Sequence, residues 1–336
     1  SATLVVSEPE PELTRALLDL GAIPWWREGM GRSVLTDTSA WAHKLLWLAS
    51  GLTPDTALAV VNPELPPAAR GPALRLRDAF ALGDRIAIAP GLLGSPGLSL
   101  GAILRPDEPG LPRFFAQIPP FVDEIICVWD GHIPSNLPSS SRRRDIARPL
   151  AGDFAAQRNA MLDACTGDWV LYLDGDELLP TEVWNALPGL LASEAMTGEA
   201  EDGGGGGGIA AAAFPRLTLY PDEKHAKCGY GLWPDLQVRL FRRHAGLRFE
   251  RPVHERLAGI AGDVAVLLNA PLLHESALRN TPSALTHKLE GFDAASGGTL
   301  RHVHSRDYPH LSLRLLPGAG RFTPPFSTLV IPPERV

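Results

Sequence analysis

The segment DFAAQRNAMLDACTGDWVLYLDGDE, residues 153–177, joins a helical pattern to a strand pattern that ends in acidic residues. Asp153 is a typical N-cap residue, and Gly167 follows the helical pattern as a typical terminator. The apolar run WVLYL comes next and has the length of a buried strand. The segment therefore predicts a helix and then a strand that brings Asp174 and Asp176 to its carboxyl end.

The residues before this segment repeat the alternation of strand and helix. LSLGAIL (98–104) predicts a strand, and PGLPRFFAQI (109–118) predicts a helix with proline at its start. FVDEIICVWDG (121–131) predicts a second strand, which ends in Asp130. A basic polar stretch (132–145) follows, and we expect it to be a mobile loop. The order β-α-β-α-β is typical of a doubly wound sheet, whose ligands bind at the carboxyl ends of the strands.

The residues after this segment predict additions to the sheet. A helix is expected over about 181–195, and the stretch 194–213, with six consecutive glycines, is expected to be a flexible loop. Several strand patterns and one late helix follow, which suggests an antiparallel or mixed extension of the sheet. The strands are predicted at 214–220, 236–243 and 247–257, and the helix at 287–296.

The first hundred residues predict a separate α/β region. Short apolar strand patterns alternate there with helix patterns, which favours a parallel sheet with helices on its faces. The strands are expected at 4–6, 33–37, 57–63 and 85–90, and the helices at 11–22 and 38–51. This region has no glycine-rich phosphate loop, so we assign it no chemistry.

Composition limits the class of protein. Of 336 residues, 45% are hydrophobic and 21% are charged, which is typical of a globular protein with a sizeable core. The net charge of -7 gives no basic field for nucleic acid, so we expect no nucleic-acid partner. Cys127, Cys165 and Cys228 are too far apart for a disulfide framework, which favours a reducing compartment.

Two stretches have the position or the length of a targeting or membrane segment. The N-terminal residues lack the basic flank and apolar core of a signal peptide. Residues 86–104 contain no charge, but their four glycines and two prolines favour strand, loop and strand over a membrane helix. We therefore expect a cytoplasmic protein, which a membrane-linked acceptor would bring to the inner membrane as a peripheral protein.

The acidic end of the central strand suggests a metal site. Mg²⁺ and Mn²⁺ prefer oxygen ligands, and one or two carboxylates often suffice when a substrate phosphate completes the coordination. Asp174 and Asp176 supply two carboxylates, and Gly175 between them lets the backbone approach a nucleotide closely. An isolated Asp-x-Asp is more often a solvated turn. Here its position after the third strand of a β-α-β-α-β unit favours a metal site.

Four stretches, taken in order, resemble family 2 glycosyltransferases of the GT-A fold, most closely the bacterial branch that includes lipopolysaccharide-core glucosyltransferases. They are RPDEPGLPRFFAQIPPFVDEIICVWDG (105–131), DFAAQRNAMLDACTGDWVLYLDGDELLP (153–180), WPDLQVRLFRR (233–243) and FERPVHERL (249–257). The resemblance implies a Rossmann-like mixed sheet flanked by helices. It also implies an inverting transfer of a hexose from a nucleotide sugar, usually a UDP-sugar, with Mn²⁺ or Mg²⁺.

The resemblance divides the chain into three parts. Residues 99–290 are expected to form the GT-A domain, 1–98 an N-terminal α/β region or small domain of unknown role, and 291–336 a tail that wraps the surface. It also assigns donor-binding residues along the chain. These are Arg105, Asp107, Glu108, Asp130, Arg158 and Asp174 for the nucleotide sugar, and Asp174 and Asp176 for the metal.

The catalytic base of an inverting transfer is a carboxylate that takes the proton of the acceptor hydroxyl. The resemblance favours Glu255 as this base, and Asp235 is the second choice. If residues 247–257 form one strand, His254 and Glu255 point to opposite faces. His254 is then either a ligand of the metal or diphosphate or a structural histidine. Trp233 either stacks on an acceptor sugar or lies in the core.

Other readings of the chain remain open at this stage. A non-catalytic sugar- or nucleotide-binding module on the same fold is the main alternative, and a nucleotidyltransferase is another. Arg142, Arg143, Arg144 and Arg148 either bind an anion or form a solvated loop. The group His302, His304 and His310 lacks zinc-like spacing. The acceptor, a glycan, a lipid-linked glycan or a protein, and the oligomeric state are not determined by the sequence.

Overall fold

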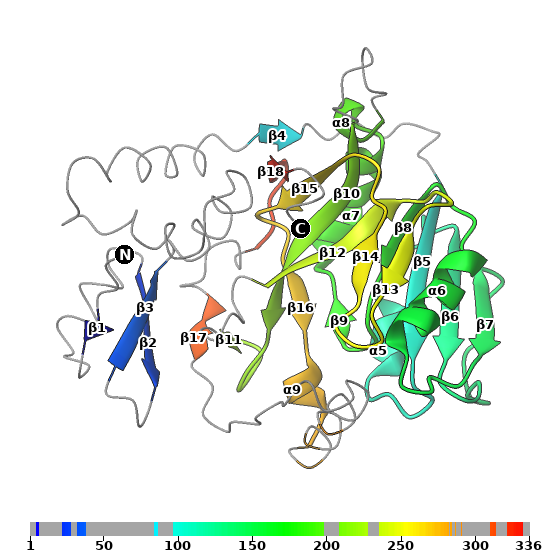
Figure 1. Cartoon of the computed structure of the whole chain (residues 1–336), viewed down its shortest axis with the longest axis horizontal. Coiled ribbons are helices and arrows are strands. Elements are labelled where there is room, and N and C mark those ends of the chain that lie inside the picture. Colours follow the sequence, from blue (N-terminus) through cyan, green and yellow to red (C-terminus); the bar gives the residue numbers. More distant parts are fainter. Residues whose placement is uncertain are drawn as a thin grey trace.

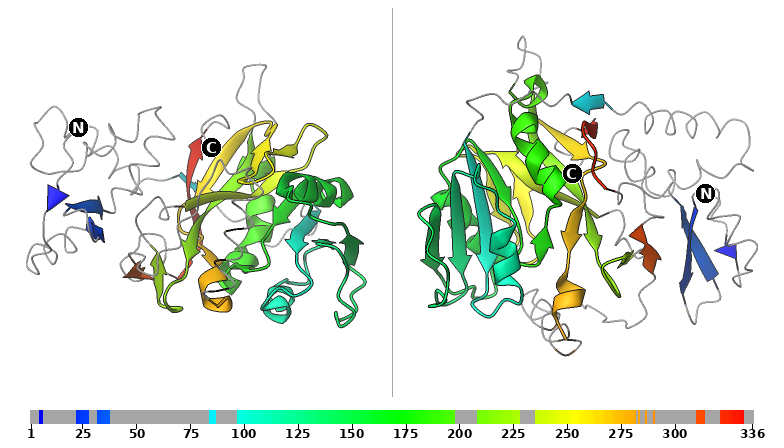
Figure 2. Two further views of the ribbon diagram at one scale, coloured as in Figure 1. Left: turned by 60° about the horizontal axis from the view of Figure 1, so that its bottom comes forward. Right: turned by 180° about the vertical axis from the view of Figure 1, so that it is seen from behind.

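The computed structural model describes most of the chain from residue 97 onward and four short strands before it. The described residues are 5–6, 22–27, 32–37, 84–86, 97–197, 208–227, 235–281, 283, 286, 290, 310–313 and 321–331. In this part, eleven strands form one mixed sheet with helices on both faces (Figures 1 and 2). The predicted α/β class, with a Rossmann-like mixed sheet flanked by helices, is confirmed.

The parallel half of the sheet is doubly wound. Its strands lie in the order β8-β5-β6-β7, so the order reverses between β5 and β8. The elements are β5 (Leu98–Leu104), α5 (Leu111–Ala116), β6 (Glu124–Trp129), β7 (Arg143–Ala147), α6 (Phe154–Ala164) and β8 (Trp169–Tyr172). As predicted, Asp153 caps α6, and its Oδ1 accepts a hydrogen bond from the Ala156 N–H at 2.8 Å.

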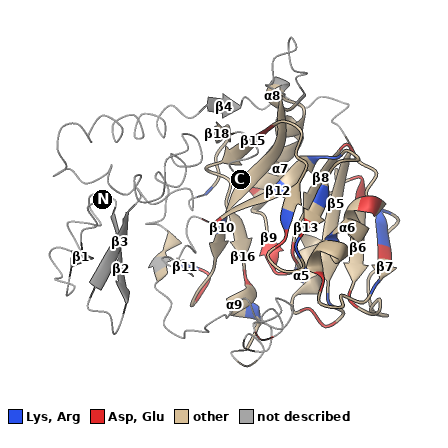
Figure 3. Cartoon of the chain, in the orientation of Figure 1, with Lys and Arg blue, Asp and Glu red and all other residues tan. Residues whose placement is uncertain are grey.

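The basic loop predicted over 132–145 extends only to residue 142, because strand β7 begins at Arg143, and its mobility stays a prediction. Arg143 and Asp145 form an ion pair of 2.9 Å on this strand, and Figure 3 shows basic and acidic residues next to each other along β7. Arg142 donates to the Pro119 carbonyl at 3.1 Å. These arginines stabilise the edge of the sheet, because pairing within the chain satisfies both their charge and their N–H groups.

The other half of the sheet mixes strand directions, as predicted. Strand β12 is antiparallel to both β8 and β10, so β10 runs parallel to β8. The elements are β9 (Glu177–Leu178), α7 (Thr181–Leu191), α8 (Glu194–Thr197), β10 (Ile209–Thr218), β12 (Asp235–Arg242), β15 (Asp263–Leu267), β16 (Leu272–His274) and α9 (Ser276–Arg279). The loop predicted over 194–213 was too long at both ends, because α8 occupies residues 194–197 and β10 begins at residue 209.

Two strands from outside 99–290 join this sheet. Strand β18 (Phe326–Ile331) pairs with β15, and β4 (Asp84–Ile86) pairs with β18, both antiparallel. Phe326 is fully buried. The predicted tail therefore contributes a sheet strand and core contacts, while the proposed domain limits remain a prediction.

Alternation along β5 explains how both faces of the sheet are covered. Leu98, Leu100 and Leu104 pack in one cluster with side chains of α5 and α7. Gly101 faces the other side, where a Cβ would lie 2.0 Å from the sulfur of Met161 on α6. Side chains of a strand alternate between faces, so one short run supports two helix layers.

Residues 247–257, predicted as one strand, form a hairpin. Its strands are β13 (Arg248–Glu250) and β14 (Arg256–Ala258), and the turn between them contains Arg251 and His254 with φ of 73° and 54°. The predicted alternation of side chains therefore does not hold across 251–255.

The N-terminal strands form an antiparallel sheet, which corrects the expectation of a parallel one. Strands β1 (Val5–Val6) and β2 (Ala22–Arg27) both pair antiparallel with β3 (Arg32–Asp37). The predicted helices at 11–22 and 38–51 and the strand at 57–63 lie outside the described residues, apart from Ala22 in β2. The predicted helix at 287–296 lies outside them except for residue 290.

A separate two-stranded sheet joins β11 (His225–Lys227) to β17 (His310–Ser312). No helix in the part of the chain that the structure describes is both long and apolar enough to cross a membrane.

Candidate active site

The candidate site lies where several parallel strands end at one edge of the sheet. Strands β5, β6 and β8 are parallel, and β10 and β16 run in the same direction. Their carboxyl ends therefore meet at one edge, which brings together residues far apart in sequence. Arg105, Asp130, Asp174, Thr218 and His274 lie at or just beyond these ends.

Asp174 is held by two arginines. Its Oδ1 accepts from Arg158 Nη2 at 2.9 Å, and its Oδ2 accepts from Arg239 Nη2 at 3.0 Å. Burial alone would raise the pKa of Asp174, but the two guanidinium groups hold it well below its ordinary value. Asp174 is therefore a carboxylate at every pH at which the protein is expected to work.

Arg158 links the two functional carboxylates predicted from sequence. Its Nη2 binds Asp174, and its Nε donates to Glu255 Oε1 at 2.7 Å. Its guanidinium also lies over the ring of Tyr172, 4.8 Å from the centroid. The side chain is 9% exposed, and its Nη1 has no hydrogen-bond partner among the described residues. This leaves the two N–H groups of Nη1 buried and without a partner among the described residues.

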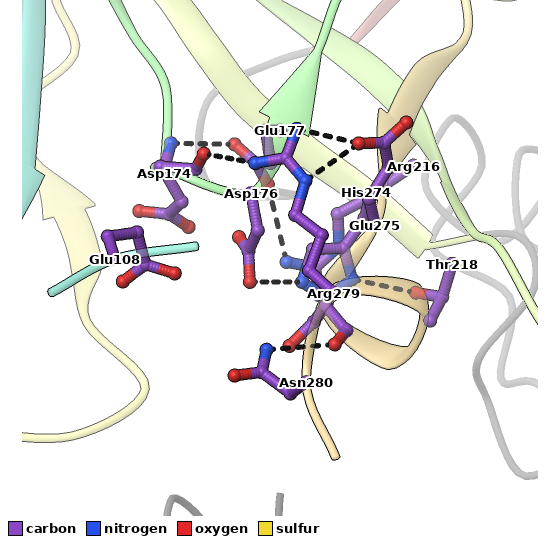
Figure 4. A network of polar contacts seen from close by, with 12 residues as sticks. Glu108, Asp174, Asp176, Glu177, Arg216, Thr218, His274, Glu275, Arg279 and Asn280 are labelled. Carbon is purple, nitrogen blue, oxygen red and sulfur yellow. Dashed lines mark hydrogen bonds and ion pairs between the residues drawn. The ribbon is translucent and has the colours of Figure 1, made fainter. Parts of the chain in front are cut away.

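Asp176 faces a histidine that the sequence analysis did not select. His274 Nε2 lies 3.5 Å from Asp176 Oδ2, and His274 Nδ1 lies 3.1 Å from Thr218 Oγ1 (Figure 4). Contact with the hydroxyl fixes the ring, so Nε2 points to the carboxylate. Asp176 itself is 3% exposed.

Buried ion pairs stabilise residues 174–177, which we call the acidic turn. Glu177 is fully buried, and its Oε1 accepts from Arg239 Nη2 at 2.6 Å. Arg216 lies 3.5 Å from the same oxygen and 2.6 Å from Asp235 Oδ2. Asp235, the second candidate base, therefore pairs with Arg216, its cross-strand neighbour.

The residues after β5 lie at the same edge. Arg105 Nε is 3.1 Å from Glu108 Oε2, while Asp107 is 81% exposed. A Cβ on Gly175 would lie 2.9 Å from Glu108 Cγ and 3.0 Å from Leu104 Cδ2. Gly175 therefore allows the acidic turn after β8 to pack against the loop after β5, which is a second use of the glycine beyond the predicted approach of a nucleotide.

Two other predicted residues make none of the contacts above, and a third lies outside the described residues. The Asp130 side chain accepts from the Leu150 N–H at 2.8 Å and so stabilises the loop before α6. His254 is exposed on the β13–β14 turn, and it is His274 that lies beside Asp176. Trp233 lies outside the described residues.

The basic and histidine groups considered from sequence have structural contacts. Arg148 donates from Nη1 to Gln157 Oε1 at 2.6 Å, near the start of α6. His310 packs its ring against Tyr220 and His225, while His302 and His304 lie outside the described residues.

Two functional candidates were missed by the sequence analysis. Arg239 gave one signal, because a charged residue inside the apolar strand pattern LQVRLF needs a buried partner. His274 gave none, since nothing in the sequence places β16 beside the acidic turn.

The residues fit a divalent ion only in part. Among the described residues, no group of three His, Cys, Asp or Glu side chains is arranged to hold a metal. Both oxygens of Asp174 are bound by arginines, whereas Asp176 and His274 present an oxygen and a nitrogen to each other. The Asp176 carboxylate suits Mn²⁺ or Mg²⁺ if water and a substrate phosphate supply most of the other ligands, whereas the imidazole nitrogen of His274 suits Mg²⁺ poorly.

Comparisons with known proteins give one sequence relative and several structural ones. No family model matches the chain. A TPR repeat-containing protein of Synechococcus elongatus is 30% identical over 167 residues, which are 47% of this chain and 34% of that protein. The chain thus spans about a third of the length of the curated relative it matches.

The similar solved structures align with less than half of the chain. The mannosyltransferase PcManGT from Pyrobaculum calidifontis, in complex with GDP-Man and Mn²⁺, has 16% identity and a TM-score of 0.30, over 41% of this chain and 40% of that one. S. aureus TarS in complex with UDP has 13% identity and a TM-score of 0.29, over 44% and 46%. Glucosyl-3-phosphoglycerate synthase from Mycobacterium tuberculosis, in complex with Mn²⁺ and UDP, has 17% identity and a TM-score of 0.25, over 37% and 45%. TM-scores of this size establish no common fold, so the function of this chain is inferred from its own site.

Proposed function

We propose that this chain is a GT-A-type glycosyltransferase that resembles family 2, including its lipopolysaccharide-core branch. It transfers a hexose with inversion from a nucleotide-diphosphate sugar, with a UDP-sugar as first choice. The acceptor is a glycan, a lipid-linked glycan or a protein.

One observation supports this proposal above the others. Arg158 joins Asp174 and Glu255 at 2.9 and 2.7 Å, although these residues are 16 and 97 positions away along the chain. The three residues were selected from sequence for a donor site and a base. Their meeting at the strand ends of a doubly wound sheet is the arrangement that a nucleotide site uses.

Arg158 is well placed to bind the donor diphosphate. Its buried Nη1 lacks a partner among the described residues, and an unpaired buried donor is costly. A diphosphate oxygen would satisfy this N–H and gain a charge-assisted hydrogen bond. The diphosphate would also compete with Glu255 for the guanidinium, which would release the carboxylate as a base.

The proposed metal ligands are Asp176 and His274. His274 replaces His254 in this role, because its Nε2 faces Asp176 Oδ2 at 3.5 Å. Asp174, two residues before Asp176, forms ion pairs with Arg158 and Arg239 instead. When bound, a divalent ion neutralises the charge that develops on the leaving diphosphate.

Glu255 is the proposed base. Its side chain lies 13% exposed on the β13–β14 turn and contacts Arg158, which would bind the donor. Asp235 remains the weaker candidate, since Arg216 and Gln237 bind its two oxygens at 2.6 Å each. A base must be within hydrogen-bond reach of the acceptor hydroxyl, and a position beside the donor-binding arginine meets this need.

The proposal is tested first by calorimetric binding of UDP, with GDP and CDP as alternatives, each with Mn²⁺ and with EDTA. Metal-dependent binding of one nucleotide is expected, followed by slow hydrolysis of its sugar derivatives. If folded protein binds none of the three nucleotides, the transferase proposal is wrong and a non-catalytic sugar-binding module on this fold becomes the better hypothesis.

A further inference from the structure

Residues 272–280, which contain β16 and α9, are joined to the acidic turn by backbone hydrogen bonds. His274 in β16 pairs with Glu177 in β9. The Glu275 N–H donates to the Asp176 carbonyl at 2.8 Å. The turn with the proposed metal ligand Asp176 is therefore anchored to a segment about one hundred residues further along the chain.

The side chain of Arg279 connects this turn to a second loop. Its Nη1 donates to the Gly175 carbonyl at 2.7 Å and to the Pro109 carbonyl at 3.3 Å. Pro109 directly follows Asp107 and Glu108, the predicted donor-binding residues after β5. One guanidinium nitrogen thus binds a carbonyl from each of the two loops that form the proposed site.

Glycine makes room for this contact. A Cβ on Gly110 would lie 2.8 Å from Arg279 Cζ, and Gly110 has a φ of 86°, in the left-handed region. A side chain at position 110 would therefore be strained and would also displace the guanidinium.

A buried carboxylate fixes the orientation of Arg279. Glu275 is 2% exposed, and its Oε2 lies 2.8 Å from Arg279 Nε and 2.6 Å from Nη2 (Figure 4). Its Oε1 lies 2.9 Å from Nη1 of Arg113, which belongs to α5. Because Nε and Nη2 both contact Glu275, the third nitrogen, Nη1, points to the carbonyls of Gly175 and Pro109. Arginine can bind this way because its five donors form a rigid fork.

We infer that Arg279 is a positioning residue that sets the spacing between the loop after β5 and the acidic turn after β8. This inference rests on the proposed function, since it concerns the donor and metal site. Arg279 acts on the site through the carbonyls of Gly175 and Pro109. A site held in one geometry before binding loses less free energy on ordering its ligands.

The first test measures amide hydrogen exchange in the free protein, which needs no ligand. Arg279→Gln is expected to speed exchange in both loops, residues 105–110 and 174–177. Arg243→Gln is the matched control, because Arg243 also donates to two carbonyls, those of Gly167 and Thr166, at the opposite end of β8. Equal exchange of both loops in the two variants would overturn the inference, whatever nucleotide the wild type binds.

The second test measures binding of Mn²⁺ with UDP by calorimetry. Arg279→Gln is expected to weaken this binding roughly 10-fold. A loss of this size is typical when a residue that orients a metal ligand, without binding the metal itself, is removed. Arg243→Gln should leave it unchanged. Unchanged binding in Arg279→Gln, in a wild type that binds UDP, would also overturn the inference.

Arg279→Lys separates a positioning role from general stability. Lysine can pair with Glu275 but cannot also reach both carbonyls, so thermal stability should recover while loop exchange stays fast. A wild type that binds no nucleotide would contradict the proposed function, and the exchange comparison would still decide the role of Arg279.

Discussion

At the scale of single residues, the site consists of carboxylates whose charge depends on buried arginines. Arg158 and Arg239 bind different oxygens of Asp174, and both guanidinium groups also lie over the ring of Tyr172, 4.8 and 4.4 Å from its centroid. Buried charges are stable in a protein when they are paired and hydrogen-bonded. The site is therefore sensitive to the loss of any one charge.

Replacement of Asp176 by Asn is expected to abolish Mn²⁺-dependent binding of UDP, because an amide is a weaker ligand for a divalent ion than a carboxylate. Asp176→Ala should in addition abolish turnover. Calorimetry with and without EDTA measures the first effect. Asp222→Asn, at an exposed carboxylate that pairs with His225, serves as the control, and full activity in Asp176→Ala would refute the metal assignment.

Replacement of Asp174 by Asn should destabilise the protein at neutral pH by about 3 kcal/mol, since it removes one of the two carboxylates with which each of the buried arginines Arg158 and Arg239 pairs. The folded-state pKa of Asp174 lies below its ordinary 3.8. Its stabilising contribution is therefore complete above that value and is lost as the pH falls towards the folded pKa.

Denaturant unfolding of wild type and Asp174→Asn, from neutral pH down to about pH 3, measures this difference. The gap in unfolding free energy should narrow only at the acid end. A constant gap across the series would mean that the charge of Asp174 is not the cause.

At the scale of elements, helix α6 holds the hairpin that contains the proposed base. Asn159 exchanges two hydrogen bonds with the backbone of Phe249 in β13, at 2.8 and 2.9 Å. The Phe154 N–H also donates to the Pro252 carbonyl at 2.9 Å. Neighbouring positions of one helix thus carry Arg158, which is proposed to bind the diphosphate, and Asn159, which binds the hairpin with the proposed base.

Asn159→Ala should loosen the β13–β14 hairpin and lower the turnover rate, roughly 10-fold, with UDP affinity nearly unchanged, because Glu255 and not the donor loses its support. Steady-state kinetics and amide exchange at residues 248–258 measure the two effects. A loss of UDP affinity equal to the loss of turnover would instead indicate that α6 itself is disturbed.

At the scale of the whole molecule, the site depends on strands from distant parts of the chain. The acidic turn contacts β16 and α9, and the sheet beside β16 extends through β15 and β18 to β4. Binding at this edge should therefore stabilise the global fold as well as the loops.

UDP with Mn²⁺ at about 100 times its Kd should add about 2.7 kcal/mol to the stability of the native state. Thermal unfolding followed by circular dichroism should show a higher Tm that EDTA reverses. An equal rise in Tm with Mn²⁺ alone would indicate a metal site that does not depend on the nucleotide.

The sequence by itself determined three strands of the parallel half of the sheet, β5, β6 and β8, with the helices between them, but not its edge strand β7. Local patterns were sufficient there, because a cap, an apolar strand and a short connection each depend on neighbouring residues. Asp153, the helix after it and the WVLYL strand are all found where the pattern predicts them. The acidic pair at the strand end followed from the same pattern.

Only the tertiary structure decided what faces these residues. His274, Arg239 and Arg279 contact residues of the acidic turn that lie 98, 65 and 104 positions away along the chain, and no local pattern specifies such contacts. The hairpin at 248–258 and the antiparallel N-terminal sheet were missed for the same reason. Strand direction and register depend on which surfaces become buried together, and a sequence pattern shows only that a surface is apolar.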